Sequence, residues 1–138
     1  MKEPTLDDLR GLDIYLGTPY GKYPAGLEQA FIDACKLCGA LMLGGLVVYS
    51  PIAHTHPIAL HAGIDPVDHR IWLPFDRVRM DKADAMLVAM MRSWETSIGI
   101  QHEINVFMEA GKPVYFLDVE EMKLAPTIVK ARQGACPA

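Results

Sequence analysis

The chain has 138 residues, of which 51% are hydrophobic and 22% are charged. This length and composition are typical of one globular domain and exclude a disordered chain. The formal net charge of −4, with no run of basic residues, argues against binding of polymeric nucleic acid, which needs a cationic surface. The longest apolar run, residues 40–49, contains two glycines and is too short to cross a bilayer, so we expect no membrane partner.

The cysteines bear on the cellular compartment, because Cys35 and Cys38 form a C-x-x-C motif. That spacing occurs in redox and metal-binding proteins. Here it lies inside a long helical pattern and lacks a second cysteine pair for zinc, which favours two core thiols in a reducing cytoplasm. The first ten residues are polar and acidic, unlike a signal peptide. We therefore expect a cytoplasmic protein.

Short apolar runs alternate with amphipathic stretches along the chain. The first run, residues 13–16, ends at glycines and a proline and predicts a buried strand. A helical pattern begins at Pro24 and ends at the glycine pair 44–45, and a second strand is expected at 46–49. Further strands are expected at 83–89 and 113–117, and further helices at 75–82, 97–111 and 120–131.

This alternation, with continuous apolar strands, predicts a parallel sheet covered by helices on both faces. We expect a single α/β domain over residues 1–138, a Rossmann-like or flavodoxin-like three-layer sandwich. Such sheets bind ligands at the carboxyl ends of their strands, where the strand order reverses. Residues 52–75 hold four of the five histidines and show little periodicity, so we expect a long loop over the pocket, with at most one short helix in it.

Two segments at the carboxyl ends of the predicted strands are candidates for ligand binding. The loop after the first strand contains Gly17, Thr18, Pro19 and Tyr20. A glycine lets a ligand approach the backbone, and Thr18 offers a hydroxyl to a phosphate or sugar. The loop lacks the G-K-[ST] ending of a Walker loop, and its residues also suit a simple tight turn.

The second segment follows the third strand and reads S-x-G-x-x-x-E, with Ser97, Gly99 and Glu103. Ser97 suits the N-cap of a helix, whose first amides are free to bind an anion. Glu103 lies in a turn that packs against the sheet. It is a candidate catalytic group, and a solvated helix glutamate is the alternative.

Taken in order, these segments resemble the nucleoside 2-deoxyribosyltransferase-like superfamily. The resemblance extends from Ile14 to Leu117 and also includes Asp76, seven residues before Ala83, and the Gly-Lys-Pro-Val sequence at 111–114. It implies cleavage of the N-glycosidic bond of a nucleoside or nucleotide without metal or cofactor. It further implies that Glu103 is the nucleophile, that Asp76 helps to transfer a proton to the leaving base, and that residues 17–20 contact the base and sugar.

The chemistry is consistent with two opposed carboxyl groups. A carboxylate stabilises or captures the oxocarbenium-like sugar, and a partly protonated carboxyl group protonates the base. The S-x-G-x-x-x-E form resembles the nucleotide-hydrolase branch, in which the serine at the position of Ser97 contacts a 5′-phosphate. The resemblance therefore favours hydrolysis of a nucleoside 5′-monophosphate. The first loop departs from the arginine-bearing form of that branch, with Lys22 as the alternative cation.

The histidines allow three interpretations: a metal site, contacts to the ligand, or a structural role. His54 and His56 would point to one side of an extended chain, but neither H-E-x-x-H nor a cysteine–histidine pattern accompanies them. We therefore expect no metal, and we treat His54 and His56 as candidate substrate contacts. A non-catalytic nucleotide sensor, a deoxyribosyltransferase and a histidine-bound metallohydrolase remain as alternative functions. The resemblance also implies a homo-oligomer.

Overall fold

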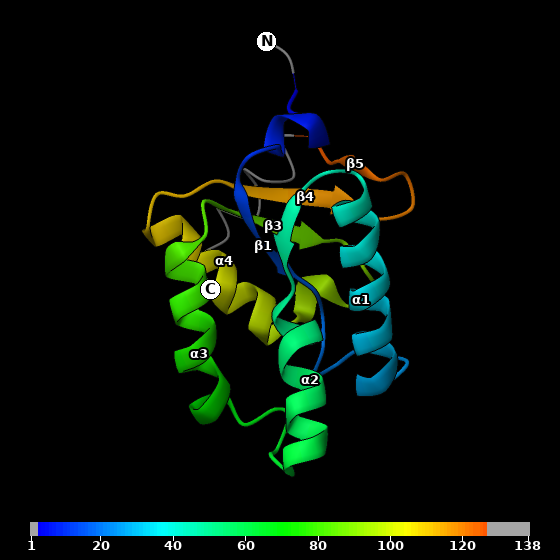
Figure 1. The fold of residues 1–138 in the computed structure, drawn as a ribbon, viewed down its shortest axis with the longest axis vertical. Helices are drawn as coiled ribbons and strands as arrows, with labels where there is room; N and C mark the ends of the chain where they lie inside the picture. The colour runs from blue at the N-terminus through cyan, green and yellow to red at the C-terminus, as the bar shows by residue number, and fades with distance from the viewer. Residues whose placement is uncertain (1–2, 127–138) are drawn as a thin grey trace.

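The computed structural model describes residues 3–126 (Figure 1). Its strands are β1 (Asp13–Gly17), β2 (Val47–Tyr49), β3 (Ala85–Ala89), β4 (Val114–Asp118) and β5 (Lys123–Leu124). Its α-helices are α1 (Leu27–Leu43), α2 (Pro51–Ala62), α3 (His69–Lys82) and α4 (Ile98–Glu109). Short 3₁₀ helices occur at Leu6–Leu9 and Trp94–Thr96. Among the described residues, no helix is both long and apolar enough to cross a membrane.

The strands form one sheet in the order β2-β1-β3-β4-β5. The neighbours β2–β1, β1–β3 and β3–β4 are parallel, and β5 is antiparallel to β4. The direction of the strand order changes at β1, so that its neighbour β3 belongs to the other half of the sheet. This order is that of flavodoxin-like folds, and the crevice beyond β1 and β3 is where they bind ligands. The expected α/β class is therefore confirmed.

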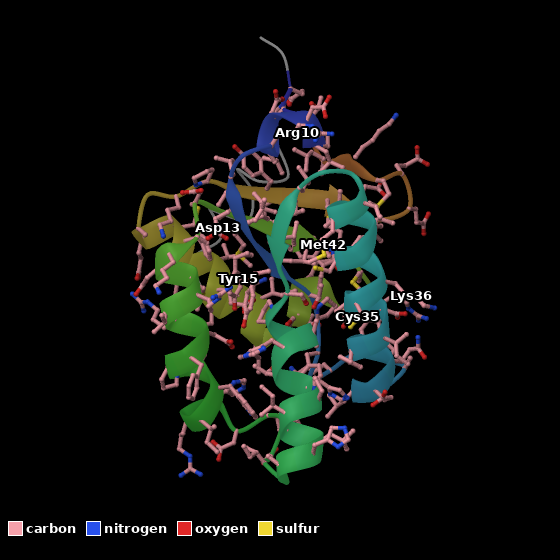
Figure 2. All side chains as sticks on the ribbon, viewed as in Figure 1. Arg10, Asp13, Tyr15, Cys35, Lys36 and Met42 are labelled. Atoms are coloured by element: carbon pink, nitrogen blue, oxygen red, sulfur yellow. The ribbon has the colours of Figure 1, made fainter. Side chains whose placement is uncertain are left out.

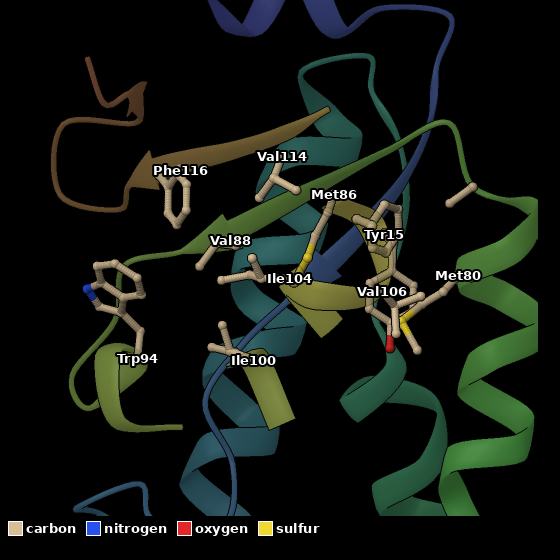
Figure 3. Packing of buried hydrophobic residues seen from close by; sticks show 12 residues of the cluster. Tyr15, Met80, Met86, Val88, Trp94, Ile100, Ile104, Val106, Val114 and Phe116 are labelled. Carbon is tan, nitrogen blue, oxygen red and sulfur yellow. The ribbon is translucent and has the colours of Figure 1, made fainter. Parts of the chain in front are cut away.

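Helices cover both faces of the sheet. Because side chains alternate between the two faces along each strand, each strand contributes residues to two apolar layers. Ile14, Leu16 and Leu87 belong to an apolar cluster that includes Leu41 of α1. Tyr15, Met86 and Val88 belong to a second cluster with residues of α3 and α4, among them Met80, Ile100 and Ile104 (Figure 3). The core thus has one layer on each side of β1 and β3, as the three-layer prediction requires.

The predicted loop over residues 52–75 is wrong. The Oγ atom of Ser50 accepts a hydrogen bond of 3.2 Å from the amide of Ala53, and this cap begins α2. Gly63 ends α2 with φ of 69°, a left-handed conformation that glycine adopts readily. After a short connection, α3 begins at His69 rather than at residue 75. The prolines Pro57 and Pro74 lie inside these helices and hid the helical signal in the sequence.

Other boundaries differ less from the prediction. α1 begins at Leu27 rather than at Pro24. A turn and β5 occupy residues 119–124, where the first part of a helix was expected, and the remainder of that segment lies outside the described residues. Cys35 and Cys38 are free thiols on α1, the former exposed and the latter buried. Figure 2 labels Cys35 on this helix. The placement of the C-x-x-C motif inside a helix is therefore confirmed, whereas the expectation of two core thiols is wrong for Cys35.

Candidate functional site

A cavity of about 310 Å³ opens at the carboxyl ends of β1 and β3. Four parts of the chain form its wall: the loop after β1, the first turns of α2, the segment from Pro66 to Asp76, and the start of α4. The loop follows β1 directly, and α4 is the first α-helix after β3. The cavity therefore occupies the crevice at which flavodoxin-like sheets hold ligands.

Glu103 of α4 lines this cavity and is hydrogen-bonded to the sheet beneath it. The hydroxyl of Tyr15, on β1, donates a bond of 2.6 Å to its Oε2 atom. Tyr15 is 0% exposed, and its ring packs at 5.6 Å from that of Phe107, between centroids. Burial raises the pKa of Glu103 to about 8, against the lowering effect of the Tyr15 hydrogen bond and with a smaller upward effect of Asp76.

Asp76 of α3 supplies a second carboxyl group to the same cavity. Its Oδ1 atom is buried and has no hydrogen-bond partner among the described residues. Burial raises the pKa of Asp76 to about 6. Two carboxyl groups with raised pKa values therefore line one cavity from separate helices, an arrangement suited to acid–base chemistry near neutral pH.

Gly17 brings the end of β1 close to the carboxylate of Glu103. A Cβ atom at this position would lie 3.3 Å from Oε1 of Glu103 and 2.5 Å from the methyl carbon of Met86. A side chain at this position would therefore displace the end of the Met86 side chain and crowd the carboxylate of Glu103. The prediction that a ligand approaches the backbone here stays a prediction, and the polar neighbour of Gly17 in the structure is the carboxylate of Glu103.

The hydroxyl groups of Thr18 and Ser97 also belong to residues of the cavity wall. Thr18 is 5% exposed, and its Oγ1 atom has no hydrogen-bond partner within the described chain. Ser97 caps α4 as predicted, with its Oγ atom accepting a bond of 3.3 Å from the amide of Ile100. Gly99 lies in the first turn of the same helix and lines the cavity. Thr18, Tyr20, Ser97, Gly99, Asp76 and Glu103 are thus brought to one site.

Within the described residues, four predicted contacts lie outside the cavity wall: Gly17, Pro19, His54 and His56. The two histidines belong to α2, where the helical geometry turns them away from the side that carries Thr55. His54 contacts the ring of Tyr49, with centroids 6.0 Å apart. The extended-chain geometry expected for the histidine pair is wrong, because the segment is helical.

Sequence reasoning assigned no role to Tyr15, although it opens the Y-L-G-T-P-Y sequence. Its polar hydroxyl at a core-facing position of a strand was the available signal. Trp72 also lines the cavity, and its Nε1 donates a hydrogen bond of 2.9 Å to the carbonyl of Asp65. Among residues 3–126, no group of three or more histidine, cysteine, aspartate or glutamate side chains is arranged to hold a metal ion.

The fold and the cavity define a flavodoxin-like α/β protein with a two-carboxyl pocket at the carboxyl edge of its sheet. Residues 12–119 match the model of the family DUF1937, a domain of unknown function. The match covers most of the chain, which therefore belongs to this family. No curated protein matches the sequence.

Proposed function

We propose that this protein is a hydrolase that cleaves the N-glycosidic bond of a nucleoside 5′-monophosphate. The observation that carries the proposal is the placement of Glu103 and Asp76 in one cavity, on α4 and α3 respectively. Glycosidic cleavage needs one group to stabilise or capture the sugar cation and one to protonate the leaving base. Two carboxyl groups from different elements can serve both needs.

Glu103 is the nucleophile in this proposal. Its Oε2 atom is held by Tyr15, and its Oε1 atom lies beside the backbone of Gly17. In the first step, the bond between the anomeric carbon and the base nitrogen breaks, and its electron pair leaves with the base. Oε1 then forms an ester bond with the anomeric carbon, so that the positive charge of the sugar is neutralised by the carboxylate.

Asp76 supplies the proton in the same step. It transfers its proton to the departing base, which leaves neutral, and becomes a carboxylate. In the second step it accepts a proton from water while the water oxygen attacks the anomeric carbon. The ester bond to Glu103 breaks, Glu103 regains its carboxylate and Asp76 regains its proton. Both groups return to their first state, and the net change is addition of water to the glycosidic bond.

The raised pKa values support this cycle, since it requires the two carboxyl groups to share one proton. With the pKa of Asp76 at about 6 and that of Glu103 at about 8, the pair holds one proton between these values. In the free protein the order of the two pKa values places that proton mainly on Glu103, whereas the reactive form carries it on Asp76. The transition state favours this form, because the positive charge that develops on the sugar stabilises the ionised carboxylate of Glu103.

A 5′-phosphate is the part of the substrate for which Ser97 and Thr18 provide partners. The first turn of α4 supplies free amides and the positive end of a helix dipole. Thr18 adds a buried hydroxyl without a partner within the described chain. Lys22 lines the cavity as well and is the nearest substitute for an arginine in the first loop.

The proposal includes a cytoplasmic homo-oligomer. Its support is the exposure of large apolar side chains near the cavity: Phe75, next to Asp76, is 67% exposed, and Ile98, in the cavity wall, is 63% exposed. Large apolar side chains exposed to this degree are one feature of surfaces that contact another protein chain. Light scattering coupled to size-exclusion chromatography tests this part, and a monomer at working concentration would contradict it.

The function is tested by chromatographic detection of base release from a panel of ribo- and deoxyribonucleosides and their 5′-monophosphates. We expect release from one or more monophosphates and weaker release from the matching nucleosides. Added free base that appears in new nucleoside would instead indicate a transferase. Binding of a monophosphate without release from any member of the panel would contradict hydrolysis and support the nucleotide sensor.

A further inference from the structure

His56 lies behind the cavity wall and is hydrogen-bonded through both ring nitrogens. Nδ1 is 2.6 Å from the hydroxyl oxygen of Tyr20, and Nε2 is 2.9 Å from Oε1 of Glu28. The imidazole is 8% exposed and is stacked on Phe31, with ring centroids 4.6 Å apart. One buried side chain of α2 therefore joins α1 to the loop after β1.

The partners fix the roles of the two nitrogens. A carboxylate only accepts hydrogen bonds, so Nε2 carries the proton that faces Glu28. In the neutral ring Nδ1 then accepts, and the Tyr20 hydroxyl donates to it. The hydrogen of that hydroxyl is thereby committed to His56, and the rotation of the Tyr20 side chain is restricted. The edge of the Tyr20 ring meets the imidazole, with an interplanar angle of 82°.

Tyr20 is the residue through which this arrangement reaches the cavity, because Tyr20 lines the wall and His56 does not. The same loop has a second attachment to α1, where the hydroxyl of Tyr23 donates a bond of 2.7 Å to Asp33. Tyr20 is therefore connected to α1 through His56 and Glu28, and Tyr23 is connected to it directly through Asp33. Without His56, the Tyr20 hydroxyl would lose this partner, while the bond of Tyr23 to Asp33 would still connect the loop to α1.

We propose that His56 is a positioning residue: with Glu28 it holds Tyr20 in place as a wall of the cavity and so sets the affinity for the ligand. His56 acts through Tyr20 and touches no reacting atom. The chemical step on Glu103 and Asp76 is therefore expected to continue without it, whereas binding of the ligand weakens. The kinetic part of this inference rests on the proposed function, and its structural part does not.

The structural part is tested by hydrogen exchange of the backbone amides of residues 18–23 in the full chain. His56→Ala and Tyr20→Phe both remove the hydrogen bond between the Tyr20 hydroxyl and His56. We expect exchange in this segment to become about tenfold faster in each, the factor that corresponds to the loss of one hydrogen bond. Exchange in β3 should stay unchanged. His56→Gln, whose amide can both accept and donate, should restore most of the protection. His61→Ala is the matched control, since His61 is exposed on the same helix.

The kinetic part is tested with the 5′-monophosphate that releases base fastest. We expect KM to rise about tenfold in His56→Ala, with kcat within about threefold of the wild type. Equal acceleration of exchange in β3 and in residues 18–23, or an unchanged KM, would overturn the positioning role. If the wild type releases no base at all, the proposed function fails and the exchange measurement alone decides this inference. If His56→Ala does not fold, Tyr20→Phe and His56→Gln decide it.

Discussion

The hydroxyl of Tyr15 donates a 2.6 Å hydrogen bond to Oε2 of Glu103 and so connects β1 with α4 beneath the cavity. We expect Tyr15→Phe to reduce kcat about 10- to 100-fold, the range expected for one hydrogen bond to a charged group. The ring itself would remain packed against Phe107. Since this bond lowers the pKa of Glu103, its loss should move the alkaline limb of the pH–rate profile upward. An unchanged kcat and profile would show that Tyr15 has only a packing role.

The pH dependence of kcat/KM follows from the two carboxyl groups. Below about pH 6 both are protonated and no nucleophile is present, and above about pH 8 both are ionised and no acid is present. The profile should therefore be bell-shaped, with its maximum between these limbs. In Asp76→Asn the rate should be lower and its alkaline limb should disappear. A profile that is flat across this range would contradict the shared proton.

Stability should change with pH in the opposite sense to that of a salt-bridged carboxylate. The pKa of Glu103 is raised from 4.5 to about 8 by burial, so the folded protein binds a proton that the unfolded chain releases between these values. Stability is therefore lost as pH rises through that window. Glu103→Gln keeps an acceptor for Tyr15 without the buried charge. We expect it to be more stable than the wild type by about 2 kcal/mol at about pH 9, and equal to it at about pH 4.

Chemical denaturation of both proteins at the two pH values measures this difference. Glu109→Gln is the control, because Glu109 is an exposed residue at the end of the same helix. Its stability relative to the wild type should not vary in the same way with pH. Equal pH dependence in the wild type and Glu103→Gln would mean that the carboxylate is well solvated in the folded protein.

Gly17→Ala tests the close approach of β1 to the carboxylate. The added methyl group would meet the Met86 side chain at 2.5 Å and Oε1 of Glu103 at 3.3 Å. We expect a loss of about 1–3 kcal/mol in stability, the usual range for overpacking, and a loss of activity of more than about tenfold. Gly39→Ala is the matched control: it lies within α1 and has nothing within 4 Å, so it should be neutral or stabilising. Full activity of Gly17→Ala would separate this glycine from the site.

Much of the fold was accessible from the sequence because the buried strands are short, continuous apolar runs. Residues 85–89 are all buried, and the sequence Met86-Leu87-Val88 permits little else. The helices in the segment 52–75 could not be predicted in this way. Its helices begin at polar caps, Ser50 and Asp68, but each contains an internal proline that ordinarily argues against a helix.

The candidate site was predicted in the parts that follow a strand directly. Thr18 follows β1 directly, and Ser97 caps α4, the first α-helix after β3, so their place at the sheet edge follows from the topology. The position of Asp76 facing the cavity depends on where α3 begins and how it packs, and here the prediction relied on resemblance. The exclusion of His54 and His56 from the cavity wall depends on the phase of α2, which periodicity did not reveal.

The central claim, that Glu103 forms a covalent bond with the sugar, is tested most directly by mass spectrometry after a slowed reaction. A 2′-fluoro analogue of the preferred monophosphate destabilises the sugar cation and slows both steps. We predict that base is released in a single equivalent and that the peptide containing Glu103 gains the mass of one sugar phosphate. The adduct should be absent from Glu103→Gln and present in Glu109→Gln. Base release from the analogue by a protein whose mass stays unchanged throughout would contradict the account.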